Sequence, residues 1–331
     1  MGVLNLLNAK IIISRSVSPY LNLALEDFLF KNSTAKQCLL FYSNLPSVII
    51  GRNQNPWTEL NVRQCRKDWV NIVRRQSGGG TVFHDLGNVN YSVIMDRQNF
   101  SHTRNAQIMA KALQRSNIDA SVNNRHDIVL SSTGEKLSGS AYKIARSRCY
   151  HHGTMLLNTD LLNISKYLRS YTTGIRSSGV KSVRSPVVNV NVPVSKFVYD
   201  AIHTYLETYH LEKVPQITSI TAEDIMGIED IAKMEEQLRS WNWTFGQTPK
   251  FQQTLKEEKL FQHPLTVNIS VLHGRIDNAQ FVTEDKKLSD ELSTYDWNGL
   301  RYDSGSVNQI LLQHTPSEDV RAVVSWLART I

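Results

Sequence analysis

The stretch VRRQSGGGTVFHD, residues 73–85, contains three successive glycines between a pair of arginines and a His-Asp pair. The flanking residues, VNIVRR before it and NVNYSVIM after it, alternate with period two, which is typical of strands. A Walker phosphate loop needs Gly-Lys-Ser/Thr before a helix, and a dinucleotide fingerprint needs G-x-G-x-x-G opening a helix. Neither pattern is present, so the stretch is predicted to be a glycine-rich turn between strands.

Such a turn can bind a ligand through its backbone. Missing Cβ atoms let a ligand pack directly on the main chain, and successive N–H groups can form an anion-binding nest. Arg74 and Arg75 are neighbours in a predicted strand and should point to opposite faces, so only one of them is expected to reach that ligand. The alternative is a flexible hairpin tip with solvated arginines.

Two later stretches favour a binding site. GEKLSGSAYKI, residues 134–144, places Lys136 before small residues, so a ligand could pack against its ammonium, which suits charge developing on a carbonyl or phosphate oxygen. A solvated strand-end charge is the alternative. In HHGTM, residues 151–155, the adjacent histidines His151 and His152 should face opposite ways. We therefore expect one buried, hydrogen-bonded histidine there rather than a metal site.

The totals describe an ordinary globular protein. A length of 331 residues suggests two domains or one domain with an appendage, and 41% hydrophobic and 20% charged residues are unexceptional. No run reaches the roughly 18–20 apolar residues that a membrane-spanning helix needs. The three cysteines are far apart without a C-x-x-C pair, which disfavours disulfides and thiolate zinc and favours a reducing compartment.

The net charge of +7 favours an anionic partner. The basic residues gather in 63–75, 136–148 and 176–184, and their position beside glycines fits a local anion site at least as well as a nucleic-acid stripe.

The hydrophobic periodicity predicts mixed strands and helices. Helices are expected over 18–31, 103–117, 193–210 and 228–241, with a short polar helix over 58–69 and two short helical runs at the end of the chain. Strands are expected over 37–44, 47–52, 70–75, 88–95, 126–132, 136–144 and 149–158, and a hairpin turning at His273-Gly274 over 265–283. Residues 171–186 look mobile, and the aromatic segment 241–251 is the best domain boundary. Without strict alternation, a mixed sheet packed by helices is expected.

Several of these stretches together resemble one family, the lipoate–protein ligase A and mitochondrial lipoyltransferase family of the biotin/lipoate ligase superfamily. The resemblance runs in order through GRNQNPW (51–57), RRQSGGGTVFHDLGN (74–88), RHD (125–127), EKLSGSAYKI (135–144), HHGTMLLNTDL (151–161), GVKSVRSPVVN (179–189) and WNWTFGQTPKF (241–251). It implies an α+β fold: a mixed β-sheet catalytic domain of the biotin/lipoate ligase type over 1–248 and a small α+β accessory domain over 249–331.

The resemblance also implies roles for particular residues. Lys136 matches the catalytic lysine that contacts the acyl-adenylate at its carbonyl and phosphate. The positions that match the lipoyl- and adenylate-binding residues are Arg74, Arg75, Ser77, Gly78, Gly79, Gly80, Thr81, Phe83, Arg125, Asp127, Thr154, Gly179, Val180, Lys181 and Ser182. No metal ligand is expected. Asp85 and Asp127 are candidates for a general base, although a strand-end aspartate more often orients an arginine or caps a turn.

The implied activity is lipoyl transfer from lipoyl-AMP, or from a lipoylated carrier protein, to a lysine of lipoyl domains of 2-oxoacid dehydrogenase E2 subunits and glycine-cleavage H protein. GRNQNPW and an N-terminus without acids before Glu26 favour the mitochondrial transferase branch and a location in the matrix, or in the cytoplasm if the source is bacterial. Lys181 and Arg184 suit the alternative, an ATP-dependent ligase that uses ATP and Mg²⁺ to make lipoyl-AMP.

Other classes remain as alternatives. An octanoyl or biotin transferase would differ mainly in the shape of the pocket for the acyl tail. A nucleic-acid-binding module would suit the charge but lacks a helix-turn-helix, zinc-finger or RNP signature. We expect no nucleic-acid or membrane partner, and a monomer.

Overall fold

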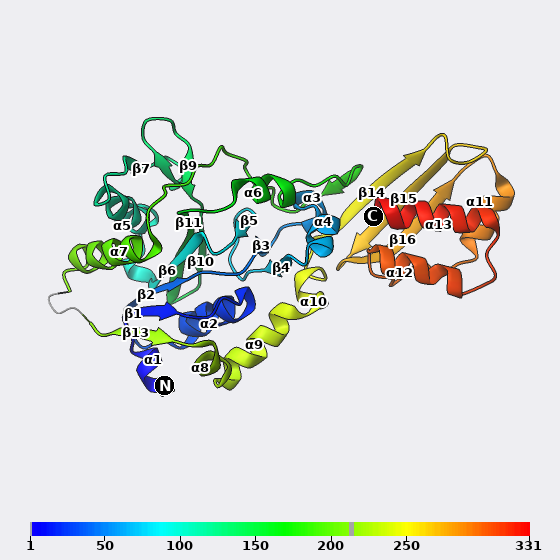
Figure 1. The fold of residues 1–331 in the computed structure, drawn as a ribbon. Coiled ribbons are helices and arrows are strands. Elements are labelled where there is room, and N and C mark those ends of the chain that lie inside the picture. Colours follow the sequence, from blue (N-terminus) through cyan, green and yellow to red (C-terminus); the bar gives the residue numbers. More distant parts are fainter. Residues whose placement is uncertain (1, 212–214) are drawn as a thin grey trace. The chain divides into compact units, whose positions relative to one another are not determined.

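The chain divides into two compact units (Figure 1). The computed structural model describes residues 2–211 and 215–331. Unit 1 comprises Met1–Arg52, Arg63–Leu168 and Ser182–Ser240, and unit 2 comprises Asn53–Val62, Arg169–Lys181 and Trp241–Ile331. The sequence placed a boundary between 248 and 249. The second unit instead begins at the start of the aromatic segment and takes in two earlier segments of the chain.

Unit 1 is built on a six-stranded mixed sheet with the order β10-β11-β6-β2-β1-β13. The strands are β1 (Ile11–Ser14), β2 (Gln37–Tyr42), β6 (Asn88–Asp96), β10 (Ser140–Ile144), β11 (Arg148–Leu156) and β13 (Ile217–Ile220). β1 is parallel to β2 and β13, while β2, β6, β11 and β10 pair antiparallel. The predicted fold class, α+β with a mixed sheet, is confirmed.

Helices cover both faces of this sheet. On one face α5 (His102–Gln114) and α7 (Val194–Thr208) pack on apolar strand residues such as Tyr91, Val93 and Met155, which form the main core. On the other face lies α2 (Pro19–Asn32), capped by the Ser18 hydroxyl and packed against α8 (Ala222–Met226) and α9 (Glu229–Arg239). The helices expected from 3.6-residue periodicity are present: α5 and α7 each bury one apolar face, whereas α2 is buried over most of its length.

Two small sheets complete unit 1. One has the order β4-β3-β5, with β3 (Ser47–Ile50) parallel to β4 (Asn71–Arg74) and antiparallel to β5 (Val82–His84). The glycine stretch joins β4 to β5, so the predicted turn between strands is confirmed. The other sheet contains β7 (Ala120–Val122), β8 (Ile128–Leu130) and β9 (Lys136–Ser138). The remaining helices are α1 (Val3–Leu7), α4 (Val62–Lys67), η1 (Arg97–Asn99) and α6 (Leu161–Tyr167).

Unit 2 contains an antiparallel sheet with the order β12-β14-β15-β16. Its strands are β12 (Ile175–Ser177), β14 (Phe251–Glu257), β15 (Leu265–Leu272) and β16 (Arg275–Val282), and its helices are α3 (Pro56–Glu59), α10 (Trp241–Thr244), α11 (Lys286–Ser293), α12 (Ser304–Asn308), η2 (Gln309–Leu312) and α13 (Glu318–Thr330). Trp57, Phe251 and Tyr302 pack edge to face or tilted in its core, with ring centroids 5.0–5.4 Å apart.

Three predictions for this unit can be checked. The hairpin turns at His273-Gly274, where both residues have positive φ, as a two-residue type I′ connection requires. Three α-helices, not two, follow the hairpin. The segment 171–186, expected to be mobile, contains β12, which pairs with β14.

No helix in the described part of the chain is long and apolar enough to cross a membrane.

Candidate active site

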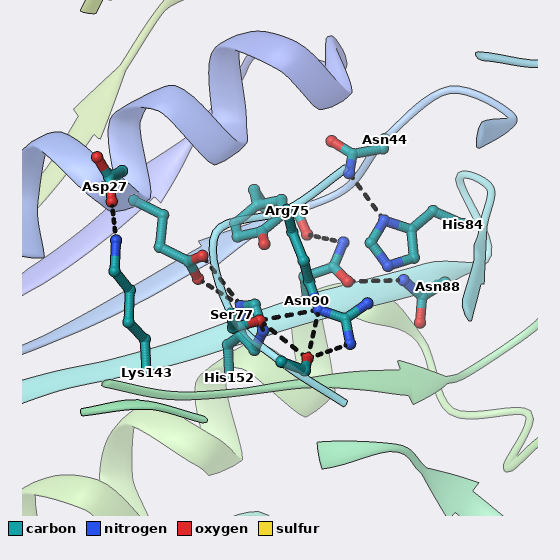
Figure 2. A network of polar contacts seen from close by, with 12 residues as sticks. Asp27, Asn44, Arg75, Ser77, His84, Asn88, Asn90, Lys143 and His152 are labelled. Atoms are coloured by element: carbon teal, nitrogen blue, oxygen red, sulfur yellow. Dashed lines mark hydrogen bonds and ion pairs between the residues drawn. The ribbon is translucent and has the colours of Figure 1, made fainter. Parts of the chain in front are cut away.

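The glycine turn is folded around the side chain of Arg75. This buried guanidinium donates from Nε to Ser77 Oγ at 2.8 Å and from Nη2 to the carbonyls of Gly78 and Gly80 at 2.6 and 2.7 Å (Figure 2). Its Nη1 donates to the carbonyl of Ile49 on β3 at 3.1 Å. Burial lowers the pKa of Arg75 to about 10, so the group remains charged at neutral pH. Arg75 therefore shapes the turn from inside.

Arg74 is also buried and also supports the main chain. Its Nη1 donates to the carbonyls of Gly51 and Arg52 at 3.2 and 3.0 Å. Burial, and then the charge of Arg52, lower its pKa to about 9. The sequence predicted that one arginine of the pair would reach a ligand, and in the structure both side chains donate to backbone carbonyls beside the turn. Strand alternation gives the direction of a side chain but not the acceptors that surround it.

The glycines differ in how strictly the structure requires them. Gly79 has φ +85°, and a Cβ there would lie 3.0 Å from Arg75 Nη2 and 3.2 Å from the Cβ of Ala141 on β10. A Cβ on Gly80 would lie 3.1 Å from Ser182 Oγ, whereas one on Gly78 would meet nothing within 4 Å. The turn therefore contacts β10 at Gly79 and has open space beside its backbone at Gly78.

This contrast predicts unequal effects on stability. Gly79→Ala should lower the free energy of unfolding by about 1–3 kcal/mol, because alanine is strained at positive φ and meets Arg75. Gly78→Ala is the matched control and should change it by no more than about 0.5 kcal/mol. Chemical denaturation of the two variants measures this. Equal destabilisation would mean that the turn does not have this conformation.

Beneath the turn, a buried chain of polar groups holds Ser77. Ser77 Oγ lies 2.8 Å from His152 Nε2, and His152 Nδ1 lies 2.9 Å from the carboxylate of Glu26 on α2 (Figure 2). The spacing resembles a Ser-His-acid triad, but Ser77 is 1% exposed and its oxygen accepts the N–H of Arg75. We therefore interpret the chain as a support for the turn. The sequence predicted one buried, hydrogen-bonded histidine without saying which of the two it is, and it missed Glu26, an acid inside an apolar helix.

Lys136 is the first residue of β9. Its Nζ is 2.8 Å from Asp127 Oδ1, and its side chain is 20% exposed. A Cβ on Gly139 would lie 3.3 Å from Lys136 Cε, so the missing side chain leaves room for the lysine. Thr154 of β11 accepts the N–H of Gly139 at 3.1 Å, and the half-exposed Arg125 lies 4.0 Å from Asp127. Lys136, Asp127, Thr154 and Arg125 are therefore brought together.

One extended segment connects Lys136 with the glycine turn. Ser182 Oγ accepts the N–H of Thr81 at 2.9 Å. Four residues later Pro186 accepts the N–H of Lys136 at 2.9 Å, and Val188 donates to the carbonyl of Lys136 at 3.1 Å. β10 makes a second connection, because Gly139 precedes it and Ala141 within it underlies Gly79. The turn and Lys136 thus share one region of unit 1.

Four expected site residues are not among the contacts between the glycine turn and Lys136: one packs against α6, and three belong to unit 2. Phe83 is buried and stacks on Tyr167 of α6, with ring centroids 5.6 Å apart. Gly179, Val180 and Lys181 belong to unit 2, where Val180 donates to the carbonyl of Asn53 at 3.0 Å. The chain passes from unit 2 to unit 1 directly after them, at Ser182.

The two candidate bases have other partners. Asp85 accepts the N–H groups of Gly87 and Asp160 at 2.9 and 2.8 Å, so it caps a turn. Asp127 pairs with Lys136. The neighbouring His84 is buried beside Asn44, at 2.9 Å, and burial with the charge of Arg75 lowers its pKa to about 3 (Figure 2). These contacts favour orienting roles over proton abstraction.

The predicted opposite orientation of the adjacent histidines is confirmed. His152 faces Ser77, whereas His151 packs against the rings of Tyr142 and Tyr91. Among the described residues, no three His, Cys, Asp or Glu side chains are grouped to hold a metal ion.

Comparison with known proteins identifies the class. Residues 18–208 match the family described as the lipoyl protein ligase A/B catalytic domain. A Schizosaccharomyces pombe protein, provisionally named lipoate-protein ligase A, is 48% identical over 346 aligned positions that cover 98% of this chain and 94% of that one. These matches define an enzyme of the biotin/lipoate ligase type. The chain belongs to the lipoate–protein ligase family.

Solved structures agree with this fold. The crystal structure of Plasmodium falciparum LipL1 with lipoate aligns with a TM-score of 0.62 and 25% identity, covering 97% of this chain and 100% of that one. The crystal structure of a lipoate-protein ligase A bound with ATP aligns with a TM-score of 0.57 and 23% identity, covering 72% of this chain and 98% of that one. A structure of the bipartite lipoate protein ligase from Thermoplasma acidophilum aligns with a TM-score of 0.58 and 21% identity, covering 72% of this chain and 96% of that one. It comes from a structural analysis of that ligase and its E2 lipoyl domain.

Proposed function

We propose that this chain is an ATP-dependent lipoate–protein ligase, which makes lipoyl-AMP and then transfers the lipoyl group to a lysine of an acceptor protein. The observation that carries the proposal is the Lys136–Asp127 pair at 2.8 Å, joined to the glycine turn by residues 182–188. The sequence alone favoured a transferase that uses ready-made lipoyl-AMP. The names of three relatives, each a lipoate-protein ligase A, favour the ligase.

The parts of lipoyl-AMP suit the parts of this region. The apolar dithiolane chain can pack on the backbone of the glycine turn, where Gly78 has no neighbouring side chain within 4 Å of a Cβ position. The mixed anhydride then lies toward Lys136, and Arg125 supplies a second cation for the phosphate. Gly179–Lys181, with Ser182, are assigned to the adenylate by the family resemblance alone.

In the first step, the lipoate carboxylate attacks the α-phosphorus of ATP and pyrophosphate leaves. ATP enters with Mg²⁺ as part of that substrate. Lys136 stabilises the negative charge that accumulates on the phosphoryl oxygens, and the pairing with Asp127 fixes the position of its ammonium before the substrate arrives. Cationic Lys181 and Arg184 suit the departing pyrophosphate.

In the second step, the acceptor amine attacks the acyl carbonyl, an amide forms and AMP leaves. A free lysine has a pKa of about 10.4, so deprotonating it at pH 7 costs roughly 4–5 kcal/mol. Proximity to the Lys136 ammonium and exclusion of water both favour the neutral amine. Lys136 also stabilises the tetrahedral oxyanion and the leaving phosphate, and no covalent enzyme intermediate is required.

Lipoyl domains of E2 subunits and H protein are the proposed acceptors. The pairing of the T. acidophilum ligase with its E2 lipoyl domain supports the first of these. We also propose a monomer located in the mitochondrial matrix. The monomer is the default expectation, and the location rests on the sequence resemblance and on the absence of acidic residues before Glu26.

An exchange assay tests the activation step. With lipoate present, the purified protein should exchange radiolabelled pyrophosphate into ATP, because lipoyl-AMP formation is reversible on the enzyme. The control omits lipoate. A protein that shows no exchange but lipoylates an acceptor from supplied lipoyl-AMP, or from a lipoylated protein, would be a transferase. A protein that does neither would contradict the proposed function.

A further inference from the structure

Trp69 is an exposed tryptophan in a backbone conformation that tryptophan rarely adopts. Its side chain is 92% exposed and its φ is +56°. It follows α4, where Val70 donates to the carbonyl of Cys65 at 2.9 Å and Trp69 donates to that of Arg66 at 3.3 Å. Helix ends closed in this way usually carry glycine or asparagine at the left-handed position. Folding alone therefore does not explain a large, exposed aromatic residue here.

The residue before it fixes Trp69 to a rigid base. The carboxylate of Asp68 accepts from Gln64 Nε2 and from the hydroxyl of Tyr167, both at 2.9 Å, and pairs with Lys166 Nζ at 2.6 Å. Lys166, followed by Gln64 and Tyr167, lowers the pKa of Asp68 to about 2. These contacts hold the end of α4 against the last turn of α6, so Trp69 projects from an anchored turn.

Two further large apolar side chains are exposed at the other end of α6. Leu162 lies in its first turn and is 80% exposed, and Leu86 is 54% exposed. The turn that carries Leu86 is joined to the helix because Asp85 accepts the N–H of Asp160, the N-cap of α6. We call Trp69, Leu86 and Leu162 the α6 surface. Large apolar side chains gathered on the outside of a protein commonly mark a docking site.

The charges around the α6 surface are arranged asymmetrically. Its carboxylates accept hydrogen bonds from the protein itself: Asp68 as above, Asp85 from two backbone N–H groups, and Asp160 from those of Leu162 and Asn163. Lys67, two residues before Trp69, is exposed, and Lys166, although it pairs with Asp68, is 46% exposed. The surface therefore offers apolar anchors with a basic edge, which is complementary to an acidic protein surface.

We propose that the α6 surface docks the acceptor protein, with Trp69 as the anchor residue and an acidic face of the acceptor domain against Lys67 and Lys166. This rests on the proposed function, since a lysine on a protein is the second substrate. The distance is suitable: Trp69 is six residues before Arg75, at most roughly 20 Å along an extended chain. A domain of about 100 residues has a radius of gyration near 13 Å. It can contact Trp69 and still present its lysine to the region that the glycine turn shares with Lys136.

Trp69→Asn tests the proposal, because asparagine accepts the left-handed conformation and should leave the melting temperature equal or higher. The KM for the acceptor domain should rise about tenfold or more, as for a tryptophan at the centre of an interface. Lipoate-dependent ATP–pyrophosphate exchange should stay within about twofold, because that half-reaction needs no acceptor. Leu162→Asp should also raise the acceptor KM. The matched control Leu4→Asn removes another exposed leucine, on α1, and should change neither reaction.

Four results would overturn the proposal. The first is an acceptor KM that is unchanged in both Trp69→Asn and Leu162→Asp. The second is a loss of exchange in Trp69→Asn that equals its loss of transfer. The third and fourth are an unchanged acceptor KM together with Trp69-dependent binding to phosphatidylserine vesicles, or together with a Trp69-dependent dimer. Failure of the proposed function is separate: the wild-type protein would then neither exchange nor transfer, whichever residue occupies position 69.

Discussion

Lys136→Ala is expected to reduce lipoyl transfer to an acceptor domain by about 10³-fold or more, because the variant loses the cation that stabilises the oxyanion and the leaving phosphate. The effect should be on kcat rather than on the KM for the acceptor, since the charge develops only in the transition state. Single-turnover transfer from supplied lipoyl-AMP measures the chemical step directly. Because Lys136 lies at a strand end and is partly exposed, the fold should be retained.

Lys196→Ala provides the matched control. Lys196 on α7 pairs with Asp200 at 2.8 Å, the same distance as in the Lys136–Asp127 pair. Its removal should leave transfer within about twofold, in line with the small worth of surface ion pairs. If Lys136→Ala transfers lipoyl at near wild-type rates, Lys136 has no part in the chemistry. If both variants lose activity equally, the loss comes from removing a lysine of an ion pair anywhere in the protein and not from a role of Lys136 in the chemistry.

The second large effect is expected at His152. His152→Ala removes the partner of two buried groups, the carboxylate of Glu26 and the hydroxyl of Ser77. Leaving a buried charge and a buried hydroxyl without their partner should lower the free energy of unfolding by about 3 kcal/mol or more. Because Ser77 begins the glycine turn, the KM for lipoate should also rise. Denaturant titration and lipoate-dependent pyrophosphate exchange measure the two effects.

The adjacent histidine is the control for this prediction. His151 is equally buried, but neither of its ring nitrogens has a hydrogen-bond partner among the described residues, and burial lowers its pKa to about 3. Replacing such an unpaired polar ring by phenylalanine should be neutral or stabilising. His151→Phe should therefore retain both stability and lipoate KM. A His152→Ala variant that behaves in the same way would show that the buried chain does not support the turn.

Much of the architecture could be predicted because it depends on local patterns. Ser18-Pro19 before an apolar run predicted α2, and the alternation on both sides of the glycines predicted β4 and β6. His273-Gly274 predicted the hairpin turn. The position of the second unit's two earlier segments could not be predicted. Residues 53–62 and 169–181 join β14 and its neighbours through contacts between positions far apart in the chain, and no local period reports such contacts.

For the candidate site, the sequence indicated the glycine turn and Lys136, which the structure connects, but not the contacts that hold them. Triple glycine and Lys136 beside small residues indicated a binding region, but the sequence did not show that Arg75 is enclosed by the turn it was expected to flank. Glu26 was missed for the same reason. Its position inside the apolar run LALEDFLF was the one available signal, since an acid at a buried helix position needs a partner. Only the fold brings His152 of β11 to it.

A crystal structure with a hydrolysis-resistant lipoyl-adenylate, in which a sulfamate replaces the phosphate, tests the central claim most directly. The acyl chain should lie against the backbone of Gly78–Gly80, with the carbonyl and the sulfamate within hydrogen-bond distance of Lys136 Nζ. If the compound binds elsewhere while the glycine turn faces solvent and Lys136 keeps only Asp127, the account is wrong.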